Sequence, residues 1–150
     1  MSPKFSLQNV LDFRHRRVER LEIELGRLLT AQRETETRLL SLREFQHDLM
    51  ERLKDAQQGE IDLSQIGLLR LNIMQVNAYM EDVSFELARV NREVAEKRDE
   101  LIKARQSEET LQILKKKRHE AYQAEQVQIE ARALDDIYIA RAFRNQQQGA

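Results

Sequence analysis

Hydrophobic residues recur along most of the chain at alternating spacings of four and three. From Leu7 to Ala56 this spacing gives fifteen positions, of which eleven are apolar. From Ile66 to Leu111 it gives fourteen positions, of which twelve are apolar. A seven-residue repeat sustained over so many turns is typical of a coiled-coil seam, because the helices of ordinary bundles are much shorter. The pattern therefore predicts two long helices, each with one apolar stripe.

Residues that end or begin helices occur at two places in the sequence. Ser2 followed by Pro3 suits an N-cap with proline at the first helical position. Gly59 suits the left-handed conformation that ends a helix, and Asp62 suits the cap of the next one, with Ser64 as a rival cap. We predict helix 1 at about 4–57, a turn at 58–62, helix 2 at about 63–143 and a frayed tail at 144–150, all in one elongated domain spanning 1–150.

The short turn decides how the two helices pair. Helices joined by so few residues lie antiparallel, so facing positions should have numbers that sum to about 119. Leu7 would then face about residue 112, and of the nine positions that continue the stripe of helix 2 beyond Leu111, only four are apolar. We therefore expect residues from 113 onward to overhang. The predicted fold is all-α: a long two-helix antiparallel coiled coil (hairpin) with a C-terminal helical overhang, monomeric by itself. The rival fold, a parallel dimer of straight helices, is disfavoured by the turn.

Charge is unevenly distributed along this hairpin. Residues 1–20 and 98–119, which the folding would bring together, hold twelve Lys or Arg and six Asp or Glu. Residues 21–97 hold ten and fifteen. A charge run is often only a solvated helix face, but the convergence of two basic clusters at one end favours an acidic partner.

Composition argues against catalysis. Charged residues are 34% of the chain, Gly and Pro are scarce and Cys is absent, which is typical of long helices rather than of a fold with an enclosed pocket. The stretch His119 to Gln123 has Gln where the zinc motif H-E-x-x-H needs its second His. We expect no enzymatic activity, no cofactor, no metal and no nucleic-acid partner. The first residues lack the apolar core of a signal peptide, and the most apolar stretch, 66–80, is interrupted by polar residues.

Several features together resemble the FliJ family of flagellar type III export proteins. They are the opening Phe5-x-Leu7-x-x-Val10-Leu11-x-x-Arg14, the turn near residue 60, the tail with Leu134-Asp135-Asp136-Ile137, and the length of the chain. The resemblance implies a cytoplasmic coiled coil, peripheral at the inner membrane only through its partners. Those partners are a hexameric export ATPase (FliI-like), an export gate protein (FlhA-like) and export chaperones. The implied role is a central stalk that couples the ATPase to the gate. The equivalent stalk of a virulence type III system and a generic coiled-coil scaffold remain alternatives.

The resemblance also indicates candidate contact residues. By analogy with rotary ATPases, the basic end carrying the termini enters the ring, which implicates Arg14, Arg16, Arg17, Arg20, Lys115, Lys116, Lys117, Arg118 and Tyr122. The gate-binding region of the family matches Arg38, Leu42, Phe45, Leu49 and Val76. Leu42 and Leu49 are also seam residues, for which core packing is the better interpretation. Phe45 lies off the seam and is the better candidate for a contact.

Overall fold

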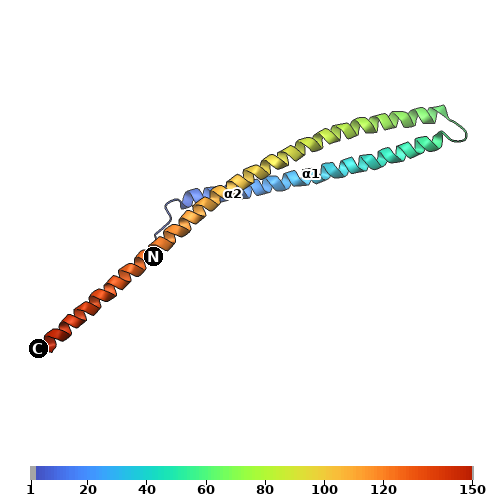
Figure 1. Cartoon of the computed structure of the whole chain (residues 1–150). Coiled ribbons are helices and arrows are strands. Elements are labelled where there is room, and N and C mark those ends of the chain that lie inside the picture. The colour runs from blue at the N-terminus through green and yellow to red at the C-terminus, as the bar shows by residue number, and fades with distance from the viewer. Residues whose placement is uncertain (1–2, 150) are drawn as a thin grey trace. The chain divides into compact units, whose positions relative to one another are not determined.

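The computed structural model describes residues 3–149, which form two long α-helices packed against each other and no strand. Helix α1 spans Gln8–Ala56 and helix α2 spans Leu63–Gln148 (Figure 1). The predicted all-α helical hairpin is confirmed. The described residues divide into two compact units, which we describe one at a time: unit 1 holds the residues up to Val18 and from Ala104 onward, and unit 2 is Glu19–Lys103. The expectation of a single domain stays a prediction.

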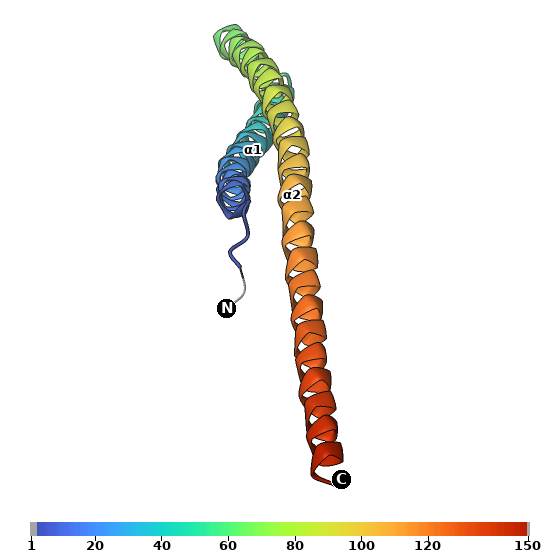
Figure 2. The ribbon, with the colours of Figure 1, turned by 90° about the vertical axis from the view of Figure 1, so that its left-hand side faces the viewer.

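The apolar stripes form the interface between the helices. Every position of both predicted stripes is buried or half-buried. In unit 2 the helices run side by side to the turn (Figures 1 and 2), where Leu49, Leu69 and Val76 form a buried core cluster. Leu53, Ala56, Ile73 and Met80 pack against this cluster. The four-and-three spacing therefore identified the buried face of each helix.

Polar residues within the stripes find partners across or along the seam. Gln32 Nε2 donates to Asn91 Oδ1 at 2.7 Å, and Gln46 Nε2 donates to Asn77 Oδ1. The Thr35 hydroxyl, 2% exposed, donates to the carbonyl of Ala31 in its own helix at 2.8 Å. No buried side-chain nitrogen or oxygen of the described residues lacks a hydrogen bond. The interruptions in the stripes thus cost little desolvation energy, because each buried polar group is paired.

The backbone conformation of the turn and the cap of α2 agree with the sequence prediction. Gly59 has a φ of 74°, and no other described residue has a positive φ. The Asp62 carboxylate accepts hydrogen bonds from the backbone N–H of Ser64 at 3.0 Å and of Gln65 at 3.4 Å. Asp62 therefore caps α2, as predicted, and the rival cap Ser64 lies inside the helix.

Side chains that hydrogen-bond across the seam are offset by a few residues from the pairing that the sequence predicted. The residue numbers of hydrogen-bonded pairs sum to 121–124 rather than 119: 24 with 97, 32 with 91 and 38 with 86 in unit 2, and 6 with 118 and 14 with 107 in unit 1. Side chains lean toward the N-terminus of their own helix. On α1 this direction leads away from the turn, and on α2 it leads toward the turn. A side chain of α1 therefore meets the side chain of an α2 residue whose number is higher than that of the residue directly opposite in the backbone.

Both outer helix ends also differ from the prediction. Pro3, Lys4 and Phe5 are not helical, and α1 begins at Gln8 instead of Lys4; the expected cap Ser2 lies outside the described residues. These first residues are held against α2 by contacts described below, which replace the missing helical turn. Helix α2 continues past residue 143 to Gln148, since residues 144–148 contain neither Gly nor Pro.

The overhang in unit 1 begins later than predicted. Contacts with the amino-terminal segment extend to Arg118, beyond residue 113. From Val127 to Gln148 every side chain is exposed, and no other helix lies beside this part of α2 in either view (Figures 1 and 2). Neither described helix contains a stretch long and apolar enough to span a membrane.

Candidate partner-binding sites

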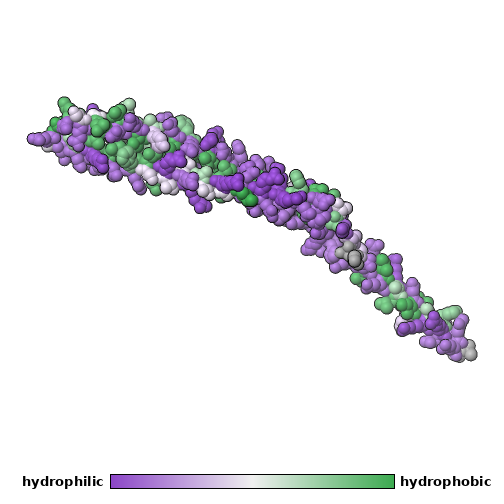
Figure 3. Space-filling view, turned by 180° about the vertical axis from the view of Figure 1, so that it is seen from behind, coloured by the Kyte–Doolittle hydropathy of each residue, from purple (hydrophilic) through white to green (hydrophobic). Residues whose placement is uncertain are grey.

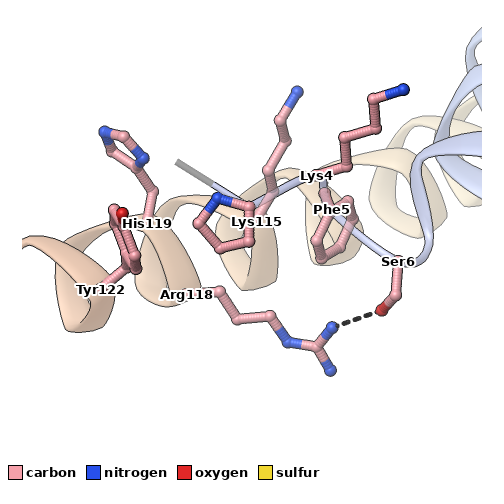
Figure 4. Close-up of a pocket in the computed structure, with 8 residues that line it drawn as sticks. Lys4, Phe5, Ser6, Lys115, Arg118, His119 and Tyr122 are labelled. Carbon is pink, nitrogen blue, oxygen red and sulfur yellow. Dashed lines mark hydrogen bonds between the residues drawn. The ribbon is translucent and has the colours of Figure 1, made fainter. Parts of the chain in front are cut away.

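The residues before α1 form an amino-terminal strap, defined here as residues 3–6, which lies against α2 in unit 1. Arg118 holds it at two points (Figure 4). Its Nη1 donates to the Ser6 hydroxyl oxygen at 2.9 Å, and its guanidinium carbon lies 5.4 Å from the centre of the Phe5 ring. This distance is within the range of a cation–π interaction. Arg118 therefore holds the strap against α2, in addition to adding positive charge to this surface.

A second layer of contacts ties the first turns of α1 to α2. Arg14 Nη1 donates to the carbonyl oxygen of Ser107 at 2.7 Å. His15 Nδ1 and Glu108 Oε1 lie 2.6 Å apart, and Gln112 Nε2 donates to the same carboxylate oxygen at 3.2 Å. Glu108 is only 9% exposed, so these bonds compensate for its burial in the seam. The predicted contact residue Arg14 is thus half-buried and engaged within the chain.

The structure separates the other predicted ring-binding residues into groups. Arg16 and Arg17 are exposed on α1 in unit 1, whereas Arg20 is exposed in unit 2. All four basic residues from Lys115 to Arg118 are exposed, and Tyr122 is half-buried. Three of the predicted residues line one hollow beside the strap, but Lys116 and Lys117 do not. The hollow has a volume of about 420 Å³ and is lined by Pro3, Lys4, Phe5, Ser6, Lys115, Arg118, His119 and Tyr122.

Sequence reasoning missed five of the eight residues that line this hollow. The strap residues were expected to belong to helix 1. His119 was considered only as a zinc ligand. The aromatic residue at position 5 and the basic residues near 118 were visible signals, but no local pattern indicated that residues 3–6 lie against α2 as a non-helical segment.

The predicted gate-binding residues all lie in unit 2, yet only some of them share a surface. Leu42, Phe45 and Val76 line a shallow hollow of about 340 Å³, together with Asn72, Gln75 and Tyr79. Phe45 is 48% exposed, whereas Leu49 is 2% exposed and belongs to the core. Arg38 lies outside this hollow and forms a 3.1 Å ion pair with Glu86. Tyr79, which is 54% exposed, was missed although it lies one helical turn from Val76.

A network of charges crosses the seam elsewhere in unit 2. Lys97 Nζ lies 2.9 Å from Glu24 Oε2 and 3.4 Å from Glu100 Oε2. The hydrogen bond from Lys97 lowers the pKa of Glu24, and the same bond raises the pKa of Lys97. This network stabilises a lysine at a stripe position, and we assign it no contact with a partner.

The last part of α2 exposes many hydrophobic side chains. The space-filling view shows apolar surface interleaved with polar surface on this terminal part (Figure 3). The large exposed residues are Val127, Ile129, Leu134, Ile137, Tyr138, Ile139 and Phe143. Such a concentration is unusual for a helix that faces only water and is typical of a surface that binds another protein.

Residues 3–149 contain no group of three or more His, Cys, Asp or Glu side chains that could hold a metal ion. Three features of residues 3–149 are candidates for contact with other molecules: the strap hollow, the hollow around Phe45 and the apolar surface of the tail.

Comparison with known proteins identifies the family. The family model described as "Flagellar FliJ protein" matches residues 3–148, which is nearly the whole chain. No curated protein and no solved structure matches the chain. The match includes the strap, both helices and the tail, so it agrees with the family that the sequence features resembled. The chain belongs to the FliJ family of flagellar proteins and is associated with flagellar protein export.

Proposed function

We propose that this protein is the central stalk of the flagellar export machinery, which binds the hexameric export ATPase and couples it to the membrane export gate. The observation that carries the proposal is the family match over residues 3–148. The stalk would act at the cytoplasmic face of the inner membrane and reach the membrane only through its partners. Export chaperones are further partners in this proposal.

The charge of the two units supports the assignment of unit 1 to the ATPase ring. Unit 1 holds twelve Lys or Arg and eight Asp or Glu, whereas unit 2 holds thirteen and eighteen. A basic unit is steered toward an acidic surface, and this attraction weakens with salt. The exposed hydrophobic residues of the tail supply the apolar contact area that charge alone does not provide.

The hollow around Phe45 supports the assignment of unit 2 to the export gate. An exposed aromatic side chain beside Leu42 and Tyr79 is the kind of anchor that dominates protein interfaces. Leu49 and Val76 contribute by holding the helices together beneath this surface, since both belong to the core cluster.

The ring assignment is tested by measuring phosphate release by the purified export ATPase with and without this protein. Wild-type protein should raise the rate. Reversal of Lys115, Lys116, Lys117 and Arg118 to Glu should remove most of that stimulation. The matched control reverses four exposed arginines of unit 2 to Glu, and so changes the net charge by the same amount: Arg33, Arg43, Arg52 and Arg70.

Circular dichroism should show that both variants keep the helical content of the wild type. Equal loss of stimulation in the two variants would contradict a specific role of the basic cluster. No stimulation and no ring binding by the wild type would favour the scaffold alternative.

The gate assignment is tested by binding to the purified cytosolic part of the export gate. Phe45→Ala should weaken binding roughly tenfold or more, because truncation of an aromatic anchor costs about 2 kcal/mol. Phe85→Ala is the control, since Phe85 is 68% exposed on the same unit but lies outside this hollow. Equal effects of the two substitutions would argue against this surface.

A further inference from the structure

The hollow beside the strap has a lining suited to negatively charged groups. Its eight lining residues include Lys4, Lys115, Arg118 and His119 but no Asp or Glu. An adjoining hollow of about 700 Å³ is also lined by Lys4 and Lys115 and likewise contains no acidic residue. The strap residues from Pro3 to Ser6 line both. Both volumes lie within the range of about 300–1,000 Å³ that is usual for ligand sites.

The basic residues of the hollow differ in whether they are bonded within the chain. Arg118 is engaged by Ser6 and by the Phe5 ring. Lys4, Lys115 and His119 are exposed, and their side chains make no hydrogen bond or ion pair with any residue in the range 3–149. Figure 4 shows the side chains of Lys4 and Lys115 directed to the same side, away from Arg118. Two ammonium groups from distant parts of the sequence thus face one region of solvent.

The walls of the hollow favour a peptide over a single small anion. Phe5 and Tyr122 are half-buried and, with Pro3, supply apolar surface next to the cations. Phosphate sites commonly use a helix N-terminus or a glycine-rich loop, whereas this part of α2 is the interior of a helix whose N–H groups are bonded within it. Two adjoining hollows that share both lysines extend farther than one anion requires. An extended segment with several carboxylates and intervening apolar atoms fits this lining.

We propose that Lys4, Lys115 and His119, placed around Phe5 and Tyr122, form a binding site for an acidic peptide segment of a partner protein. Arg118 acts as a positioning residue, because it holds the strap that carries Phe5 and Lys4. The identification of that partner with the export ATPase rests on the function proposed above. The site itself requires only that the segment is acidic and extended.

The test compares two double substitutions that remove the same charge. Lys4→Gln with Lys115→Gln removes both lysines of the hollow. Lys116→Gln with Lys117→Gln removes two lysines that do not line either hollow. The probe is a blocked peptide of six glutamates, and its binding to the full chain is followed by NMR signals of the Phe5 and Tyr122 rings at about 0.1 M salt.

The first pair of substitutions should weaken binding of the hexaglutamate probe roughly fivefold or more, and the second pair less than about twofold. Equal weakening by the two pairs would overturn the proposed site, because it would mean that the probe responds only to the total positive charge of this surface. Displacement of the probe by inorganic phosphate at equal concentration would also overturn it, since the site would then take any anion. A blocked hexaglutamine peptide should produce no shift in the ring signals.

Binding of each variant to the purified export ATPase separates this inference from the proposed function. If the wild type binds the peptide at the hollow but not the ATPase, the site stands and the stalk function fails. If the wild type binds the ATPase and both double variants bind it equally well, the stalk function stands and the assignment of the acidic segment to the ATPase fails. Selective loss of ATPase binding in the first pair supports both.

Discussion

Lys97 occupies a stripe position of α2 where the heptad pattern would place a hydrophobic side chain. Its ammonium group reaches Glu24 on α1, and its side chain is only 22% exposed. Glu108 and Gln32 are likewise stripe residues with specific polar partners. Such residues lower the apolar area of the seam, but they penalise any pairing in which their partners are displaced. At the residue scale, polar contacts therefore select the register.

The Glu24–Lys97 pair gives a prediction about pH. Hydrogen bonding to Lys97 is the main cause that lowers the pKa of Glu24 below its ordinary value of 4.5, so the contribution of Glu24 is present above that pH and is lost as the pH falls through its folded-state pKa. The bond to Glu24 raises the pKa of Lys97 above 10.5, so the contribution of Lys97 is present below that pH and is lost as the pH rises through the folded-state value.

Glu24→Gln should therefore melt at a lower temperature than the wild type at pH 7. The difference should shrink toward zero at strongly acidic pH, where the wild-type carboxyl is protonated too. Thermal melting followed by circular dichroism between pH 2 and pH 7 checks this, with Glu34→Gln as the control because Glu34 is exposed and makes no contact described above. A pH-independent difference would mean that the substitution acts through packing rather than charge.

The element that sets the pairing of the helices is the turn from residue 57 to residue 62. It combines a left-handed Gly59 with the Asp62 cap, and both devices are local. Their effect is long-range, because insertion or deletion of one residue in this turn would rotate every stripe position of α2 relative to α1. The turn and the polar seam contacts thus specify the same arrangement by independent means.

Two glycine substitutions test the turn. A Cβ at Gly59 would meet no atom within 4 Å, so Gly59→Ala should cost only the left-handed backbone strain, about 1–2 kcal/mol. Gly67 lies inside α2 and is equally uncrowded, so Gly67→Ala should instead stabilise the protein by up to about 1 kcal/mol. Urea unfolding measures both values. A stabilising effect of Gly59→Ala would show that the turn does not depend on the left-handed conformation.

At the scale of the whole molecule, the chain is divided into parts that pack and parts that do not. The stripes from Leu11 to Leu111 bury hydrophobic side chains between the helices, whereas residues 127–148 of α2 expose every side chain. In proteins most of the stability of a helix comes from packing of one of its faces, which residues 127–148 lack. The tail is therefore helical as a continuation of the packed part of α2, and its exposed hydrophobic residues gain stability only when a partner covers them.

Removal of the tail tests this division. A chain ending after Gln126 should unfold within about 0.5 kcal/mol of the full chain, since the deletion removes only exposed side chains. It should nevertheless lose binding to the export ATPase if the tail supplies apolar contacts to the ring. Urea unfolding and co-sedimentation measure the two properties. A loss of more than about 1 kcal/mol would reveal packing of the tail within the chain.

The sequence by itself determined the all-α hairpin, the buried stripes, the left-handed Gly59 and the Asp62 cap. These features follow from periodicity and local backbone preference, which act within a few residues of one another. The aromatic Phe45 was also recognised as exposed, because it lies off the stripe. The resemblance to the FliJ family was likewise visible in the sequence.

Only the tertiary structure decided which side chains meet across the seam and how the strap forms its hollow. Heptad spacing does not specify which side chains meet, because that depends on the lean of side chains along each helix and on pairs such as Lys97 with Glu24. Arg118 contacts Ser6 and Phe5, and residues 3–5 are not helical but lie against α2. A cation and an aromatic ring more than 110 residues apart in sequence thus created a surface that no local pattern describes.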